Sequence, residues 1–404
     1  MRRTGSTALI AALVAALAGA AGAGATTSQA LDRLAALQSP RTGAPTARGV
    51  SREEISAFAA WTTLAVITGG ERPDAWRVGR RTLIAAIGRR PRRPIQRVAR
   101  WALAMSAAGR LDDRDVRGLQ AGLTADWGSD GRFGAGALDL GWALLAARAA
   151  AMEPPVLALD RLRSEQGSDG GWRSRPGLRA DTVTTTTALQ ALTTWGEPRD
   201  SETVRRARRW LLRQQRRDGG FPVWRGRPSA AVETAWATLG IRALGDDPRS
   251  FTWRRRGGGG PLGYLRRLQR ASGGVAATTG GRESVLATAL TAIAFAGRPL
   301  PLEPTVSAVA ASHAPRVIRR SPVDGGHPGE VVLVAYRDNP GGTGVDPGRV
   351  RFVVGGRDLT GAARVTPLGL QVATNRVGPR PATAVLLLTD RAGNSSRTVW
   401  TIGR

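Results

Sequence analysis

The sequence predicts a mainly helical protein in which six pairs of helices form a ring, followed by a small all-β sandwich. Two observations predict this fold class. A glycine-rich turn recurs between helix-like stretches along most of the chain, and short β-rich runs replace that pattern from about Pro301. The 404 residues, 42% of them hydrophobic, are enough for two domains with cores of their own.

The N-terminal segment has the composition of a secretory signal peptide. It opens with two arginines, continues without a charge from Ala8 to Ala25, and has its first acidic residue at Asp32. The small-residue triplet at 23–25 fits a cleavage site. We therefore expect residues 1–25 to be a signal peptide and the mature protein to be secreted or extracytoplasmic.

The composition excludes several kinds of active site and indicates which macromolecules the protein would attract. The chain has no cysteine, which excludes disulfides, thiolate metal sites and thiol nucleophiles. Its 59 basic residues are all arginines, and against 31 acidic residues they give a net charge of +28. Codon bias explains an arginine-only composition, but this charge would also attract anionic wall or membrane-surface polymers. The arginines are dispersed instead of clustered with aromatic residues, so we expect no specific nucleic-acid binding.

One turn motif occurs three times, with a weaker fourth copy. The copies read DWGSDGRF at 126–133, EQGSDGGW at 165–172, QQRRDGGF at 214–221 and LQRASGGV at 268–275. Each copy follows one helix-like stretch and precedes another that is rich in Ala, Thr and Leu. The repeating unit is therefore a helix, a glycine-rich turn and a second helix.

Apolar spacing predicts two alternating series of helices. The outer series is expected at 28–38, 73–88, 113–126, 155–166, 201–215 and 260–270. The inner series is expected at 52–69, 94–109, 137–150, 181–195, 231–244 and 283–296. This alternation favours a closed ring of pairs, and an open solenoid is the alternative because it buries the same faces between neighbouring repeats.

Beyond the helices the chain changes character. β-Rich runs are expected at Glu330–Tyr336, Arg349–Val354, Leu368–Ala373 and Ala384–Leu388, with turn sequences between them. We therefore expect the helical domain over 26–300, a linker over 301–315 and a β-sandwich over 316–404.

The glutamine, the glycines and the aromatic residue of the motif form one physical unit. Two glycines allow a tight turn with positive φ, the glutamine can bond the free backbone groups of a helix end, and the aromatic ring covers that amide. We expect these residues to be structural. They are Gln166, Asp169, Gly170, Gly171, Trp172, Gln214, Asp218, Gly219, Gly220, Phe221 and Gln269.

These motifs resemble the QW repeats of squalene cyclases, which occur in looser form in protein prenyltransferases. Trp210-Leu211 with Gln214 and Gly220-Phe221 carries the resemblance best, and Tyr264-Leu265 with Gln269 and Gly274 is similar. The resemblance covers residues 28–298 and implies an α/α toroid whose inner helices line a central cavity.

The C-terminal part carries a second, less specific resemblance. The segment Thr389–Ser396 before a final strand, and Gly344–Pro347 leading into another, are similar to bacterial immunoglobulin-like modules.

Two activities of the family depend on residues that can be checked directly. The zinc of protein prenyltransferases is held by Asp, Cys and His, whereas this chain has no cysteine and its two histidines, His313 and His327, lie beyond the helices. We therefore expect no metal and no cofactor. The acid of squalene cyclases lies in an Asp-x-Asp-Asp motif; the nearest match, Asp112-Asp113-Arg114-Asp115, has another order and is expected to cap a helix.

The inner helices contain the remaining candidates for a site. Acidic residues begin four of them and would either cap the helices or form an acidic ring around one mouth of the cavity. The candidates for the cavity are Asp139, Asp181, Glu233, Glu283, Trp101, Trp142 and Trp236, with Trp61 on a further inner helix. Asp181, which precedes a run of threonines, is the single candidate for a catalytic acid.

Three hypotheses follow. We favour a monomeric, non-catalytic exported toroid that binds an apolar or isoprenoid-like small molecule, or uses its surface for protein contacts. The alternative is a terpenoid cyclase-like enzyme that uses a cavity carboxylate as its acid. The third is a protein that binds wall polymers or other polyanions, which requires the arginines to form one continuous face.

Overall fold

The computed structural model describes two compact units, one containing most of the helices and one containing the C-terminal strands. The described residues are 26–47, 49–257, 259–302, 315–323, 325, 331–338, 344–378, 381–391 and 394–403. The predicted signal peptide, most of the predicted linker and both histidines lie outside these residues. Each unit is described by itself.

The helices agree closely with the two predicted series. Residues 26–36 are helical. The next helices are α2 (Arg52–Thr68), α3 (Leu83–Ile87), α4 (Ile95–Ala107), α5 (Asp113–Asp126), α6 (Ala137–Ala149) and α7 (Val156–Ser164). They are followed by α8 (Thr182–Thr194), α9 (Glu202–Gln214), α10 (Ala231–Ala243), α11 (Pro261–Leu268) and α12 (Val285–Ala296). No helix among the described residues combines the length and the apolar character needed to cross a membrane.

One predicted helix is wrong. Residues 73–88 form a 3₁₀ turn, η1 (Pro73–Ala75), a two-stranded hairpin of β1 (Arg77–Val78) and β2 (Arg81–Thr82), and only then the short α3. Gly79 turns the hairpin with φ of 57°, a left-handed conformation that a continuous helix cannot contain. The side chain of Thr82 then caps α3 by accepting the N–H of Ala85.

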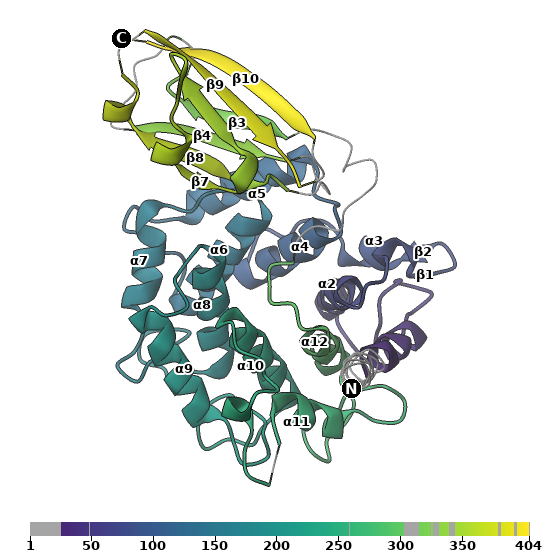
Figure 1. Ribbon diagram of the computed structural model, residues 1–404. Helices are drawn as coiled ribbons and strands as arrows, with labels where there is room; N and C mark the ends of the chain where they lie inside the picture. Colours follow the sequence, from purple (N-terminus) through teal and green to yellow (C-terminus); the bar gives the residue numbers. More distant parts are fainter. Residues whose placement is uncertain are drawn as a thin grey trace, which may run out of the picture. The chain divides into compact units, whose positions relative to one another are not determined.

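The inner helices contact one another in succession. α6 packs on α8, α8 on α10, α10 on α12 and α12 on α2, while α7, α9 and α11 each pack on an inner neighbour. Figure 1 shows the inner helices toward the middle of the unit and α7, α9 and α11 around them. Because α2 and α12 lie near opposite ends of this unit's sequence, their contact joins its first and last repeats.

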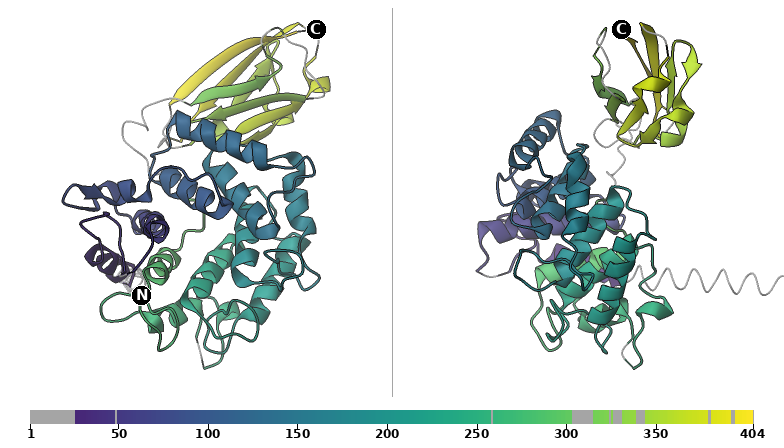
Figure 2. Two further views of the ribbon diagram at one scale, coloured as in Figure 1. Left: turned by 180° about the vertical axis from the view of Figure 1, so that it is seen from behind. Right: turned by 90° about the vertical axis from the view of Figure 1, so that its left-hand side faces the viewer.

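Side-chain contacts strengthen this join. Gln269, at the end of α11, donates from Nε2 to the carbonyl oxygen of Thr26 at 3.0 Å. Glu283 forms an ion pair with Arg33 at 2.6 Å. Figure 1 and the left view of Figure 2 show the purple first helix beside the green last repeat.

The turn motif has the same geometry in three copies. The first residue of its Gly-Gly pair, at positions 170, 219 and 273, has φ of 89°, 83° and 85°. At each of these positions a Cβ would overlap a backbone carbonyl group of the next repeat. The aspartates at 169 and 218 accept the N–H two residues later, at 3.1 and 2.9 Å. Glycine is therefore required both for the left-handed turn and for the close approach of the next repeat.

A threonine hydroxyl ties each of these turns to its inner helix. The backbone N–H at the aromatic position of the motif donates to a threonine thirteen residues later. The bonds run from Trp172 to Thr185, from Phe221 to Thr234 and from Val275 to Thr288, at 3.0, 2.9 and 2.9 Å. These three threonines therefore have a structural role, since their hydroxyls satisfy buried donors.

Thr234→Val should lower the free energy of unfolding by about 1–3 kcal/mol, because it leaves the buried N–H of Phe221 without its acceptor. Thr238→Val is the matched control on the same helix. The Thr238 hydroxyl donates only to the carbonyl oxygen of Thr234, at 2.8 Å, and removing it leaves no donor unpaired. Urea denaturation measures both, and equal losses in the two variants would contradict the proposed role of Thr234.

The C-terminal unit contains two four-stranded antiparallel sheets. One has the strand order β10-β9-β5-β6, and the other has the order β3-β4-β8-β7. The strands are β3 (Arg316–Ser321), β4 (Val331–Arg337), β5 (Arg351–Val354), β6 (Arg357–Asp358), β7 (Arg364–Thr366), β8 (Gly369–Ala373), β9 (Ala382–Thr389) and β10 (Ser395–Ile402). All four predicted runs are strands, and residues from both sheets share one hydrophobic core that includes Phe352 and Trp400.

Candidate functional site

Three inner-helix tryptophans meet in the middle of the helical unit. Trp61 of α2, Trp142 of α6 and Trp236 of α10 contact one another, with ring centroids 5.5 to 6.4 Å apart. Trp236 is nearly perpendicular to both other rings, and the three side chains are 3 to 5% exposed. Such edge-to-face pairs are typical of a packed aromatic core.

Trp142 and Trp236, which the sequence makes candidates for the cavity wall, pack against each other and against Trp61. Trp101 does not join the cluster. It is buried and donates from Nε1 to the carbonyl oxygen of Gly88 at 3.0 Å.

The segment after α12 fills further space between the inner helices. The backbone N–H of Leu300 donates at 2.9 Å to Oε1 of Gln190, a fully buried side chain of α8. Leu300 and Leu302 are 2% and 5% exposed. These apolar side chains are therefore part of the core.

The four acidic candidates are not one ring. Asp139 accepts the backbone N–H of Ala135 at 2.8 Å and the side-chain amide of Gln96. Glu283 is held by Arg33, as described above. Asp181 and Glu233 lie at the N-terminal ends of α8 and α10, and the charge of Asp181 contributes to the raised pKa of Glu233.

Asp181 is a helix cap. Its Oδ1 accepts the backbone N–H of Thr184 at 2.8 Å, and its Oδ2 accepts the hydroxyl of the same residue at 2.7 Å. Burial raises the pKa of Asp181, and the bonds from Thr184 oppose that rise. Because both oxygens accept bonds from one residue, this carboxyl group is poorly placed to give a proton to a substrate.

Glu233 is the better acid. Burial is the main cause of its raised pKa, and Asp181 adds to the shift. Among the described residues its carboxylate receives a bond only from its own backbone. The threonines that follow Asp181 made it the candidate in the sequence, and nothing in the sequence shows that its carboxyl group caps a helix while that of Glu233 does not.

The Asp112–Asp115 segment lies at the start of α5, an outer helix. Oδ1 of Asp112 accepts the backbone N–H of Asp115 at 2.7 Å, as an N-cap does. Within the described residues, no group of three or more His, Asp or Glu side chains is placed to hold a metal ion.

The raised pKa values of Asp181 and Glu233 predict how stability depends on pH. A carboxyl group that binds its proton more tightly in the folded state stabilises the fold at low pH. This contribution is lost as the pH rises from the ordinary pKa values of 3.8 for Asp181 and 4.5 for Glu233 through the higher pKa values of the folded state. Glu233→Gln should therefore lose less stability than the parent protein between pH 4 and pH 8.

Urea denaturation across this pH range measures the difference, with Glu202→Gln as the control. Bonds from Arg209 and Arg205 lower the pKa of Glu202, so its contribution has the opposite sign and is lost as the pH falls. A Glu233→Gln profile parallel to that of the parent protein would contradict the prediction.

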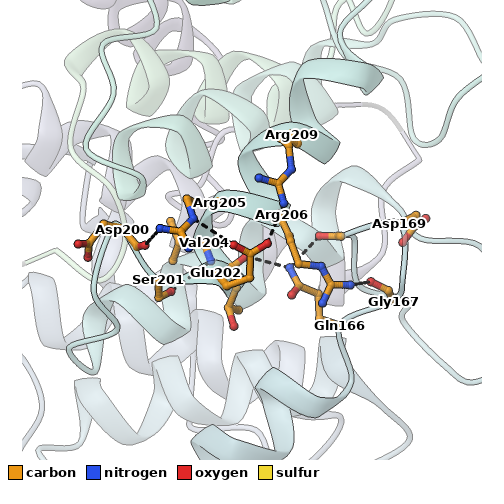
Figure 3. Close-up of polar contacts among 12 residues, drawn as sticks. Gln166, Gly167, Asp169, Asp200, Ser201, Glu202, Val204, Arg205, Arg206 and Arg209 are labelled. Atoms are coloured by element: carbon orange, nitrogen blue, oxygen red, sulfur yellow. Dashed lines mark hydrogen bonds and ion pairs between the residues drawn. The ribbon is translucent and has the colours of Figure 1, made fainter.

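The motif glutamines bridge successive repeats. Gln166 donates from Nε2 to the carbonyl oxygens of Gly170, at 3.0 Å, and Thr203, at 2.9 Å. Figure 3 shows Gln166 beside Arg206, which donates to the carbonyl oxygen of Gly167 at 2.6 Å. Gln269 makes the equivalent bonds to Gly273 and Thr26.

Gln214 does not have this role, although sequence analysis assigned it. Gln215 makes the bonds instead, to the carbonyl oxygens of Gly219 at 3.0 Å and Trp253 at 2.9 Å. The spacing explains the difference, since each bridging glutamine lies four residues before the first glycine of its turn. Gln214 is buried, and within the described residues its Oε1 has no hydrogen-bond partner.

The family model of the squalene-hopene cyclase N-terminal domain matches residues 157–255. The repeats within these residues, from α7 to α10, are therefore similar to those of squalene cyclases. Drimenyl diphosphate synthase of Streptantibioticus cattleyicolor is 34% identical over 110 residues, which are 25% of this chain and 21% of that protein. Squalene-hopene cyclase of Bradyrhizobium diazoefficiens is 33% identical over 96 residues, 21% of this chain and 14% of that protein.

The squalene cyclase-like repeats thus match only a small part of each of these curated relatives. Among solved structures, the type II terpene cyclase MstE from Scytonema aligns with 68% of this chain and 97% of its own, with a TM-score of 0.43 and 16% identity. Protein geranylgeranyltransferase-I of Candida albicans aligns with 51% of this chain and 69% of its own, with a TM-score of 0.40 and 14% identity.

Proposed function

We propose that this protein is a non-catalytic, exported binding protein built on a closed α/α toroid. The observation that carries the proposal is the contact of Trp61, Trp142 and Trp236 in the middle of the helical unit. A cyclase needs room there for a folded polyprenyl chain, whereas these rings are packed together. The bond between Leu300 and Gln190 supports the same conclusion, because it buries a chain segment between the inner helices.

The join between the first helix and the last repeat supports the closed form of the toroid over an open solenoid. The two-sheet unit would be an immunoglobulin-like domain that serves as a spacer or adhesion module. With a net charge of +28, the protein would act in contact with anionic wall or membrane-surface polymers. A toroid whose centre is packed offers its outer surface for binding.

The alternative function is a terpenoid cyclase-like enzyme, and one observation favours it. Glu233 has a raised pKa and a carboxyl group that no other described residue engages, as a general acid requires. Two of the curated relatives are named as squalene-hopene cyclases, and a third as a diphosphate synthase.

Incubation with squalene and with geranylgeranyl diphosphate, followed by mass spectrometry of the extracted products, separates the two functions. We expect no cyclised product above a control without protein. A cyclised product that is lost in Glu233→Gln, but kept in Glu202→Gln on the outer surface, would establish the enzyme. Native mass spectrometry of the protein secreted by its own host tests the binder, which predicts a ligand recovered unchanged.

A further inference from the structure

A pocket of about 310 Å³ lies where two successive repeats meet, between the segments 169–180 and 210–225. Its wall includes the side chains of Arg173, Arg179, Arg213, Arg225, Trp210 and Trp224. Arg179, Arg213 and Arg225 are exposed, so the pocket opens to solvent and is separate from the packed centre of the helical unit.

The pocket carries an excess of positive charge. Asp169 is the acidic residue among its lining side chains, and Oδ1 of this residue accepts the backbone N–H of Gly171 at 3.1 Å. Arg213 donates to the carbonyl oxygen of Asp169 at 2.5 Å. Within the described residues, the side chains of Arg173, Arg179 and Arg225 have neither a hydrogen bond nor an ion pair. Their guanidinium groups are therefore available to an anion.

The pocket also has apolar walls. Trp210 is 2% exposed, Trp224 is half-buried, and Leu178, at 52%, is one of the most exposed large hydrophobic residues among those described. Two indoles beside several arginines suit a ligand that combines a negative group with a flat or apolar body.

Gln214 is a second indication that the pocket binds a ligand. It lines the pocket, is 8% exposed, and its Oε1 is without a partner in the described part of the chain. Buried side-chain amides are nearly always hydrogen-bonded. The adjacent Gln215 uses its Nε2 for the bridge between repeats, and its Oε1 is likewise without a partner among the described residues, but it does not line the pocket. Gln214 does line the pocket, so its Oε1 can be satisfied by a ligand.

We propose that this pocket binds a small organic anion, in which a carboxylate or phosphate group is attached to a flat or apolar body. The anionic group pairs with Arg179 and Arg225, the body lies against Trp210 and Trp224, and Oε1 of Gln214 accepts a hydrogen bond from a donor on the body of the ligand, such as a hydroxyl group. This site does not depend on the function of the ring centre, so it holds for a binder and for an enzyme alike.

Isothermal titration calorimetry of the full chain with 1-naphthyl phosphate and 1-naphthoate tests the proposal and separates the two anionic groups. We expect at least one of them to bind, the neutral 1-naphthol to bind at least about tenfold more weakly, and the affinity to fall as the salt concentration rises. Arg179→Gln and Arg225→Gln should each weaken binding about threefold to fivefold, and their combination about tenfold or more.

Arg266→Gln is the matched control, because this exposed arginine of α11 does not line the pocket. It should change the affinity less than twofold. Gln214→Leu keeps the volume of the side chain and should weaken the binding of 4-hydroxy-1-naphthoate, which adds a hydroxyl donor to the same body, while circular dichroism shows the helices intact. The proposal is overturned if neither anion binds at about 1 mM, if 1-naphthol binds equally well, or if Arg266→Gln costs as much as Arg179→Gln.

Discussion

Trp236→Ala should lower the free energy of unfolding by about 4 kcal/mol, among the largest effects of any single change in the helical unit. The ring of Trp236 lies 5.7 Å from Trp61 and 5.5 Å from Trp142, centroid to centroid, and is 3% exposed. The substitution removes the buried surface of a large aromatic side chain. It leaves a cavity between three helices, which cannot move together to fill it because they are already in contact. Urea denaturation measures the loss.

The same variant tests what the middle of the unit can hold. An apolar cavity in a packed core stays dry and binds small apolar molecules, so benzene should raise the melting temperature of Trp236→Ala and leave the parent protein unchanged. Trp224→Ala, on the half-buried wall of the outer pocket, is the control and should cost much less. A loss below about 1 kcal/mol for Trp236→Ala would mean that the three rings do not form a core.

Gly273→Ala should lower the free energy of unfolding by about 3 kcal/mol. Two causes act together: φ at this position is 85°, and a Cβ would overlap the carbonyl oxygen of Gln29 in the first helix. The change therefore pushes apart the first and last repeats. Denaturation experiments measure the loss, and hydrogen exchange should show faster opening of residues 26–36.

Gly280→Ala separates the two causes, because Gly280 has φ of 73° and no described atom lies within 4 Å of the position that a Cβ would take there. It should cost about 1 kcal/mol, from backbone strain alone. If the two alanine variants were equally stable, the join between the repeats would not contribute to stability.

The sequence predicts the inner helices well because their apolar spacing and their caps agree. Ser51 and Ser284 begin α2 and α12 where serine is expected, and each accepts the N–H three residues later. The prediction fails over 73–88 because alternating polar and apolar residues around Gly79 fit both a helix and a hairpin. Local spacing could not decide between them, since the left-handed conformation of one glycine made the difference.

The candidate site was harder to predict. The sequence indicates that Trp142 and Trp236 lie on inner helices, but only the packing of three helices shows that they contact each other. Gln214 was assigned from its place after Trp210-Leu211, whereas the aligned copies of the turn motif already put Gln215 opposite Gln166 and Gln269. The outer pocket combines side chains from two repeats, and no single segment shows it.

The join between the first and last repeats also bears on the order of folding. Arg33 and Glu283 are separated by 250 positions in the chain, and Gln269 and Thr26 by 243. Contacts of such long sequence separation form late, because a large loop must close before they contribute free energy. We therefore expect the repeats to assemble first as an open arc, and ring closure to be the slow final step. The rate of this step should depend on protein concentration, because open arcs expose the surfaces through which two chains can associate.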